Sequence, residues 1–281
     1  MPRAVRARLA SLGDETSDLT LAGGYVTLGL VQIWLGRTSD ALENATQGLD
    51  HARRADDHDF THKALHVAGM AKMHGPTPWN EVLAHIDTIE ALGLPTSGMR
   101  ANAVAAQGRF EESRLLFDEL VRGLMERGAR VSALGQAIGR GWFEMLAGEL
   151  ERGLEVLGPA WVELGEIGER GVRSTVGGVY ADLLARAGRP DEAERVLDVV
   201  GEIGSPGDFL TASQAAGARA MAASARGEHD RAVELAREAA RSLTAASIWH
   251  SATTCGWSWA RCSSLRAGRR RRETPSHTRV S

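Results

Sequence analysis

Apolar residues recur every three or four positions along most of this chain, in stretches separated by short polar turns that begin with glycine. Between Leu21 and Asp50 this spacing predicts two helices. The first runs from Gly24 to Leu35 and ends at Gly36, because glycine tolerates the left-handed backbone that a helix C-terminus often needs. The apolar stripe of the second helix consists of Ala41, Leu42, Ala45 and Leu49.

The glycine that ends the first helix returns at a nearly constant interval. Its five occurrences are separated by 72, 40, 40 and 39 residues, and 72 is close to two periods. They are Gly36, Gly108, Gly148, Gly188 and Gly227. The same helical pair recurs at 174–203 and at 213–243. A fixed period of this size is typical of a helical repeat array. The pattern therefore predicts an all-α protein of about six helix pairs.

The second pair of the predicted array has an interruption. Gly75-Pro-Thr-Pro78 places two prolines within four residues, which prevents a continuous helix there. We expect a turn with a loop insertion, followed by a helix from Trp79 or Asn80 to Leu92.

The repeating unit resembles the tetratricopeptide repeat, a helix–turn–helix with an aromatic residue, a Leu-Gly pair and a small residue that opens the second helix. Tyr25, Leu28-Gly29 and Ala41 match these positions. At the small position, other units have Ala193, Ala232, Ser113 and Gly153. The period near 40 exceeds the usual unit of this family, so we expect longer helices. The match is best over 173–243, which is similar to the C-terminal repeats of bacterial ATPase-type regulators (adenylate/guanylate-cyclase-like or LuxR-like).

The resemblance implies where a partner binds, because the first helices of tetratricopeptide repeats line a concave groove that holds peptides. The candidate positions are Leu30, Ile33 and Trp34 in one unit and Ile138, Trp142 and Met145 in another. Aromatic anchors are frequent hot spots of such surfaces. The competing interpretation is that both tryptophans pack between neighbouring helices.

Three parts are expected along the chain. Residues 1–21 form an N-terminal helix or partial repeat, residues 22–247 form the tetratricopeptide-like array, and 248–281 form a divergent or disordered basic tail. The tail has three interpretations: a divergent final repeat, a segment that contacts nucleic acid through Arg269–Arg272, or the product of out-of-frame translation of GC-rich codons.

No catalytic motif accompanies the repeats. The chain has no G-x-x-x-x-G-K-[ST], G-x-S-x-G or H-E-x-x-H sequence, so we expect neither enzymatic activity nor a bound cofactor. His58, His62 and His66 share one face of a predicted helix, but a zinc site needs a third or fourth ligand from elsewhere. A polar exposed face is the simpler interpretation, and no metal is expected.

Charge and hydropathy narrow the class of partner. Through Ser247 the chain has 26 basic and 35 acidic residues, which argues against nucleic-acid binding by the repeat body. No apolar run is long enough to cross a membrane, and no secretory signal is found, so we expect a cytoplasmic protein. The leading hypothesis is a scaffold for protein–protein interaction, either a regulatory module or a detached C-terminal part of a larger ATPase-type regulator. The alternative is a small-ligand-sensing module of a transcriptional regulator.

Overall fold

Helices fill nearly all of the described structure, which is a computed structural model covering residues 2–11, 16–205 and 207–245; these residues contain no strand. The all-α prediction is therefore confirmed for this part of the chain. A short N-terminal helix, α1 (Pro2–Ser11), precedes the paired helices. The first helices of the pairs are α2 (Asp18–Trp34), α4 (His58–His74), α6 (Ser97–Ala106), the two-part α8 (Arg130–Gly135) and α9 (Ala137–Ala147), α11 (Gly171–Arg186) and α13 (Phe209–Ala225). The second helices are α3 (Thr38–Arg54), α5 (Trp79–Ala91), α7 (Phe110–Glu126), α10 (Leu150–Glu166), α12 (Pro190–Ile203) and α14 (His229–Ala245).

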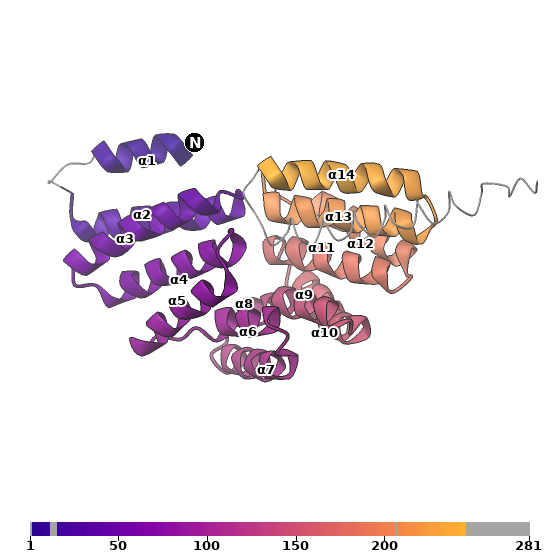
Figure 1. Cartoon of the computed structure of the whole chain (residues 1–281), viewed down its shortest axis with the longest axis horizontal. Coiled ribbons are helices and arrows are strands. Elements are labelled where there is room, and N and C mark those ends of the chain that lie inside the picture. Colours follow the sequence, from indigo (N-terminus) through magenta and orange to yellow (C-terminus); the bar gives the residue numbers. More distant parts are fainter. Residues whose placement is uncertain (1, 12–15, 206, 246–281) are drawn as a thin grey trace, which may run out of the picture.

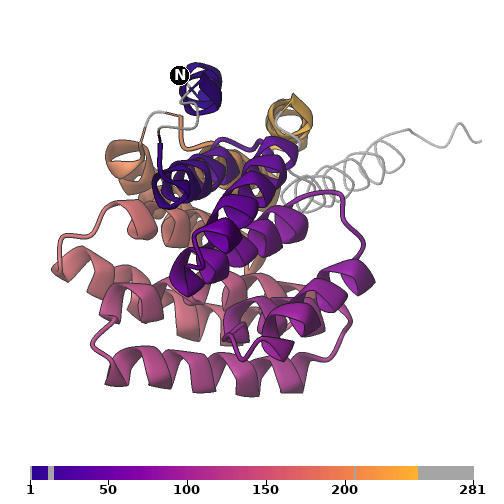
Figure 2. The same cartoon turned by 90° about the vertical axis from the view of Figure 1, so that its left-hand side faces the viewer.

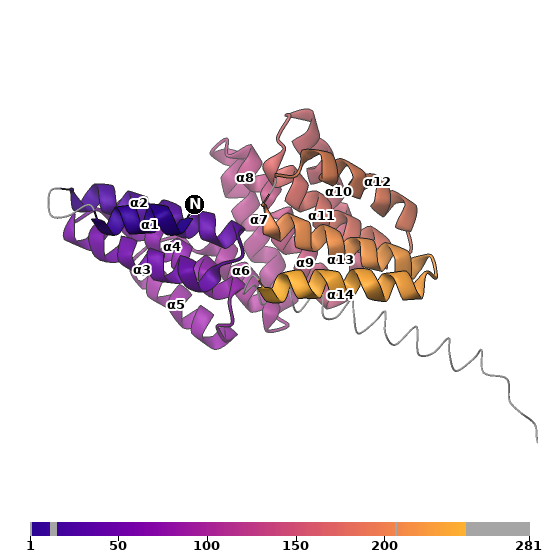
Figure 3. The same cartoon turned by 90° about the horizontal axis from the view of Figure 1, so that it is seen from above.

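These helices pack in neighbouring pairs that follow one another along an arc (Figure 1). Each first helix contacts its own second helix and the first helix of the next pair. In the described part of the chain, no two second helices pack closely on each other. Because only the first-helix layer is continuous, that layer lies on the inner side of the curvature. Figure 2 shows the stacked helices from the side, and Figure 3 shows α1 lying over α2 at one end and α13 and α14 at the other.

The turn glycines close α2, α6, α9, α11 and α13 in the same way, whereas Gly75 after α4 has a negative φ. All five predicted glycines have positive φ, between 73° at Gly36 and 81° at Gly148 and Gly227. At Gly188 the glycine amide donates to the Ala185 carbonyl (3.2 Å), and the next amide, of Arg189, donates to Leu184 (2.9 Å). Among the described residues, three further glycines with positive φ, Gly93, Gly128 and Gly168, follow the ends of the second helices α5, α7 and α10, and a fourth, Gly207, lies in the turn before α13. The 40-residue periods that begin at Gly108 and Gly148 thus each contain two turns with such a glycine, one after the first helix and one after the second. The sequence pattern predicted only the turn after the first helix.

Two predicted helix boundaries can be compared directly with the structure. The break at Gly75–Pro78 is present, and α5 follows it as expected. The first helix was predicted to begin at Gly24, but α2 begins at Asp18. Ser17 caps it, with its hydroxyl accepting a hydrogen bond from the Thr20 amide (3.3 Å). This boundary was missed because the cap lies outside the apolar stripe from which the helix was inferred.

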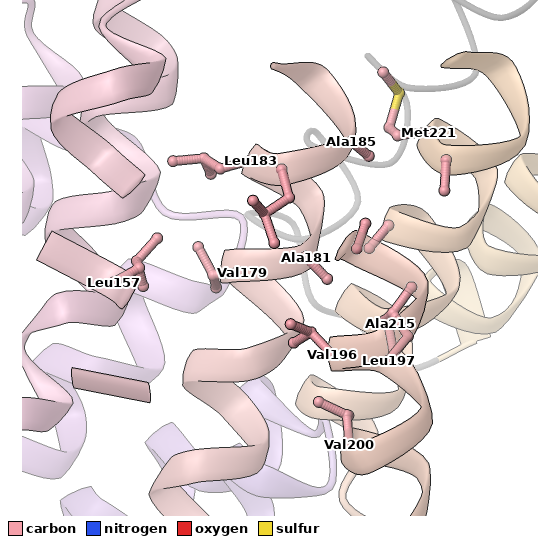
Figure 4. Packing of buried hydrophobic residues seen from close by; sticks show 14 of the residues in the cluster. Leu157, Val179, Ala181, Leu183, Ala185, Val196, Leu197, Val200, Ala215 and Met221 are labelled. Carbon is pink, nitrogen blue, oxygen red and sulfur yellow. The ribbon is translucent and has the colours of Figure 1, made fainter. Parts of the chain in front are cut away.

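The largest hydrophobic cluster lies in the C-terminal half and surrounds α11. Figure 4 shows Val179 and Leu183 of α11 pointing toward Leu157 of α10, with Leu197 of α12 beyond them. Small residues let the helices approach closely: a Cβ on Gly177 would lie 2.4 Å from the Trp161 ring. The N-terminal pairs have smaller, separate clusters. The core is therefore a series of linked patches, as expected when each pair packs only on its neighbours.

Candidate partner-binding surface

The α2 candidates divide between surface and core. Leu30 and Trp34 are 39% and 40% exposed, whereas Ile33 is only 3% exposed and packs into the cluster formed by α2, α3 and α4. Leu30 and Trp34 are four residues apart, so they are adjacent on one face of the helix. The structure therefore leaves two of the three α2 candidates able to contact a partner.

The α9 candidates are more enclosed. Ile138, Trp142 and Met145 are half-buried and pack against the large C-terminal cluster. This placement agrees with the interpretation of Trp142 as a side chain packed between helices. Leu146, which was not among the candidates, is 52% exposed on the same helix. The two candidate sets do not meet, because α4 and α6 separate α2 from α9 along the first-helix layer.

Three glycines show which sides of a first helix its neighbours occupy. A Cβ on Gly139 of α9 would meet Asn102 and Phe117 of the preceding pair. A Cβ on Gly141 would meet Leu157 of α10, the second helix of the same pair. Counted back from the turn glycine, these are positions 9 and 7. On α11, Gly178 at position 10 faces Gln214 of the next pair. On a helical wheel, positions 6 and 2 lie between the sides that the preceding and the next pair occupy. Side chains at these positions are exposed at Leu30, Trp34 and Leu146 and buried at Asp182 and Met221.

We call positions 6 and 2 before the turn glycine the inner register. Its members in α2, α6, α9, α11 and α13 are Leu30 and Trp34, Asn102 and Ala106, Trp142 and Leu146, Asp182 and Arg186, and Met221 and Ala225. This alignment relates Trp142 of α9 to Leu30 of α2, and Leu146 to Trp34. Aligning the sequence on Gly36 and Gly148 would have identified Leu146.

The inner register carries one ion pair. Arg186 Nε donates to Asp182 Oδ2 at 3.1 Å, and both side chains are largely buried. The other carboxylate oxygen, Asp182 Oδ1, is buried and has no hydrogen-bond partner. A buried oxygen without a hydrogen-bond partner costs free energy. A bound group that donates a hydrogen bond to Asp182 Oδ1 would therefore be favoured at this position.

A buried ion pair fixes α9 against the preceding pair. Glu144 is 1% exposed, and Arg114 of α7 donates to both of its oxygens, from Nε at 2.9 Å and from Nη2 at 2.6 Å. The Arg114 guanidinium also lies 5.7 Å from the centre of the Phe143 ring, which stacks on Phe117. The hydrogen bonds to Glu144, and secondarily its negative charge, raise the pKa of Arg114. This junction sets the position of Trp142 and Leu146 relative to the N-terminal pairs.

The histidine face lies on α4. His62 is half-buried and His66 is exposed, with ring centroids 6.4 Å apart in an edge-on arrangement. Surrounding protein nevertheless desolvates His66, which lowers its pKa, and nearby His62 lowers it further. The described residues contain no group of three or more His, Cys, Asp or Glu side chains placed to hold a metal ion.

The two helix layers differ in charge. The first helices, α8 included, contain eight Lys or Arg and four Asp or Glu, whereas the second helices contain nine and 23. Several first-layer cations pair with second-layer acids, as Arg100 does with Glu90 (2.7 Å) and Arg140 with Asp118. The acidic outer layer disfavours nucleic acid. Among the residues of the inner register, apolar side chains outnumber charged ones.

No family model matches this chain, and neither does any curated protein. Among the described residues, no helix has the length and apolarity needed to cross a bilayer. The predicted tail at 248–281, with its Arg269–Arg272 run, lies outside the described residues.

Proposed function

We propose that this protein is a non-catalytic helical-repeat scaffold of the tetratricopeptide type, and that its first-helix layer binds a protein or peptide segment with apolar side chains. The observation that carries the proposal is the exposure of Leu30, Trp34 and Leu146 in the inner register, where Trp34 and Leu146 occupy the same position. Large apolar side chains repeated on one continuous layer suit a partner that follows the array from pair to pair.

The arrangement of the helices supports this function. A layer of contacting first helices gives a long surface whose side chains are set by the packing of neighbouring pairs. The resemblance of 173–243 to repeats of bacterial ATPase-type regulators supports the proposal that this protein is a regulatory module or a detached C-terminal part of such a regulator. In this proposal the charged outer layer keeps the protein in solution and takes no part in binding.

Site-specific photo-crosslinking tests the proposal. A benzophenone amino acid replaces Trp34 in one variant, Leu146 in a second and Leu115 in a third. Leu115 is the control, because it is 71% exposed on the second helix α7 and lies outside the inner register. In extracts of the source organism, we expect the Trp34 and Leu146 variants to crosslink a shared protein that the Leu115 variant does not. Identical products from all three positions, or none from Trp34 and Leu146, would contradict the proposal.

A further inference from the structure

Within the described part of the chain, the first pair of the array leaves uncovered a helix face that is buried in later pairs. Counted back from the turn glycine, position 5 is occupied in α6, α9, α11 and α13 by Ala103, Phe143, Leu183 and Ala222, all at most 2% exposed. The same position in α2 is Val31, which is 39% exposed. Position 9 shows the same difference in exposure. Thr27 of α2 is exposed, whereas the equivalent residues of α6, α11 and α13, which are Met99, Val179 and Ala218, are buried.

This face is the one that receives the preceding pair. In α9, position 5 is Phe143, which stacks on Phe117 and Phe110 of α7, and position 9 is Gly139, against Asn102 and Phe117. We call Thr27 and Val31 of α2 the end face. The equivalent face of α9 forms the interface with the preceding pair, so the end face has the position of such an interface.

Helix α1 covers only the neighbouring part of α2. Leu9 fits against Gly24, where a Cβ would lie 2.7 Å from Leu9 Cδ2, and Arg6 is paired with Glu43 of α3. With 10 residues against 17, α1 is too short to extend over the whole of α2. The end face therefore continues an interface that α1 already occupies.

We propose that the end face packs against the end face of a second copy of this chain, giving a twofold dimer. From Leu19 to Trp34 there are 16 residues without a single charged side chain. Within this stretch of α2, a twofold axis through Val31 therefore brings no like charges together. Thr27 and Val31 are small enough for two helices to approach closely. Of the 12 exposed large apolar side chains in the described part of the chain, five lie on α1 and α2, namely Val5, Leu19, Leu30, Val31 and Trp34.

Sedimentation equilibrium of the full chain over a wide concentration range tests the dimer. We expect the wild type to associate, and Val31→Arg to weaken association at least ~10-fold because two buried cations would face each other. Val162→Arg is the matched control: Val162 is an exposed valine of α10, far from the end face, and its substitution leaves dimerisation unchanged.

Thr27→Arg is a second test at the next position of the same face, and circular dichroism verifies that each variant is folded. A wild type that remains monomeric at every concentration overturns the proposal. So does a folded Val31→Arg or Thr27→Arg variant that dimerises as the wild type does. Neither result affects the partner proposed for the inner register, because Leu30, Trp34 and Leu146 are unchanged in these variants.

Discussion

At the residue scale, the turn glycines Gly108, Gly148, Gly188 and Gly227 have a positive φ, and no atom lies close to the position that an added Cβ would occupy. Gly188 has a φ of 79°, and nothing lies within 4 Å of an added Cβ. Gly188→Ala therefore acts through the backbone alone, and we expect it to lower the free energy of unfolding by about 1–2 kcal/mol. Gly201 is the matched control, since it also has open space but lies inside α12. Gly201→Ala should raise stability by up to about 1 kcal/mol. Urea unfolding measures both, and equal signs for the two variants would contradict this account.

The Arg114–Glu144 pair makes a second prediction at the residue scale. Among the described residues, Glu144→Ala leaves the largely buried guanidinium of Arg114 with only the exposed Glu111 as an acidic partner. We therefore expect a loss of about 3 kcal/mol or more in the free energy of unfolding. Asp59→Ala removes the corresponding charge from the exposed pair with Lys63 and should scarcely change stability. Thermal denaturation of both variants checks this, and similar melting temperatures would contradict it.

Most helices could be predicted from the sequence, because each stripe of apolar residues is local. The break at Gly75–Pro78 and the stripe of Ala193, Val196, Leu197 and Val200 appear as expected. Two features of single elements could not be predicted. The first helix of the fourth pair is divided at Gln136, and α10 remains a helix despite Pro159 inside it. In both, packing against neighbouring helices outweighs the local preference of the chain.

The candidate site was harder to predict than the elements, because exposure depends on which neighbour covers each side of a helix. Ile33 and Trp34 are adjacent apolar residues, yet one is buried and the other is 40% exposed. Val31 has the composition of a core residue and is exposed only because α1 leaves it uncovered. Apolar spacing identifies a helix face but does not show whether another helix covers it.

At the scale of the whole molecule, contacts are local in sequence. Close contacts in the described part of the chain join elements at most three places apart in their order, and the largest hydrophobic cluster is confined to the C-terminal pairs. Stability of such an array is approximately a sum of terms from each pair and its neighbours. The two ends can therefore open separately, and a mutation in one end should not be felt at the other.

Native-state hydrogen exchange tests this independence. Leu197→Ala removes a fully buried side chain from the C-terminal cluster, and we expect a local loss of about 2–5 kcal/mol. Amides of α11–α13 should then exchange faster, while those of α2–α4 keep their wild-type rates. Ile86→Ala, in the cluster of α4, α5 and α6, should show the reverse pattern. A single cooperative core would transmit the loss of stability to every amide. Uniformly faster exchange in either variant would therefore mean that the pairs do not open as separate units.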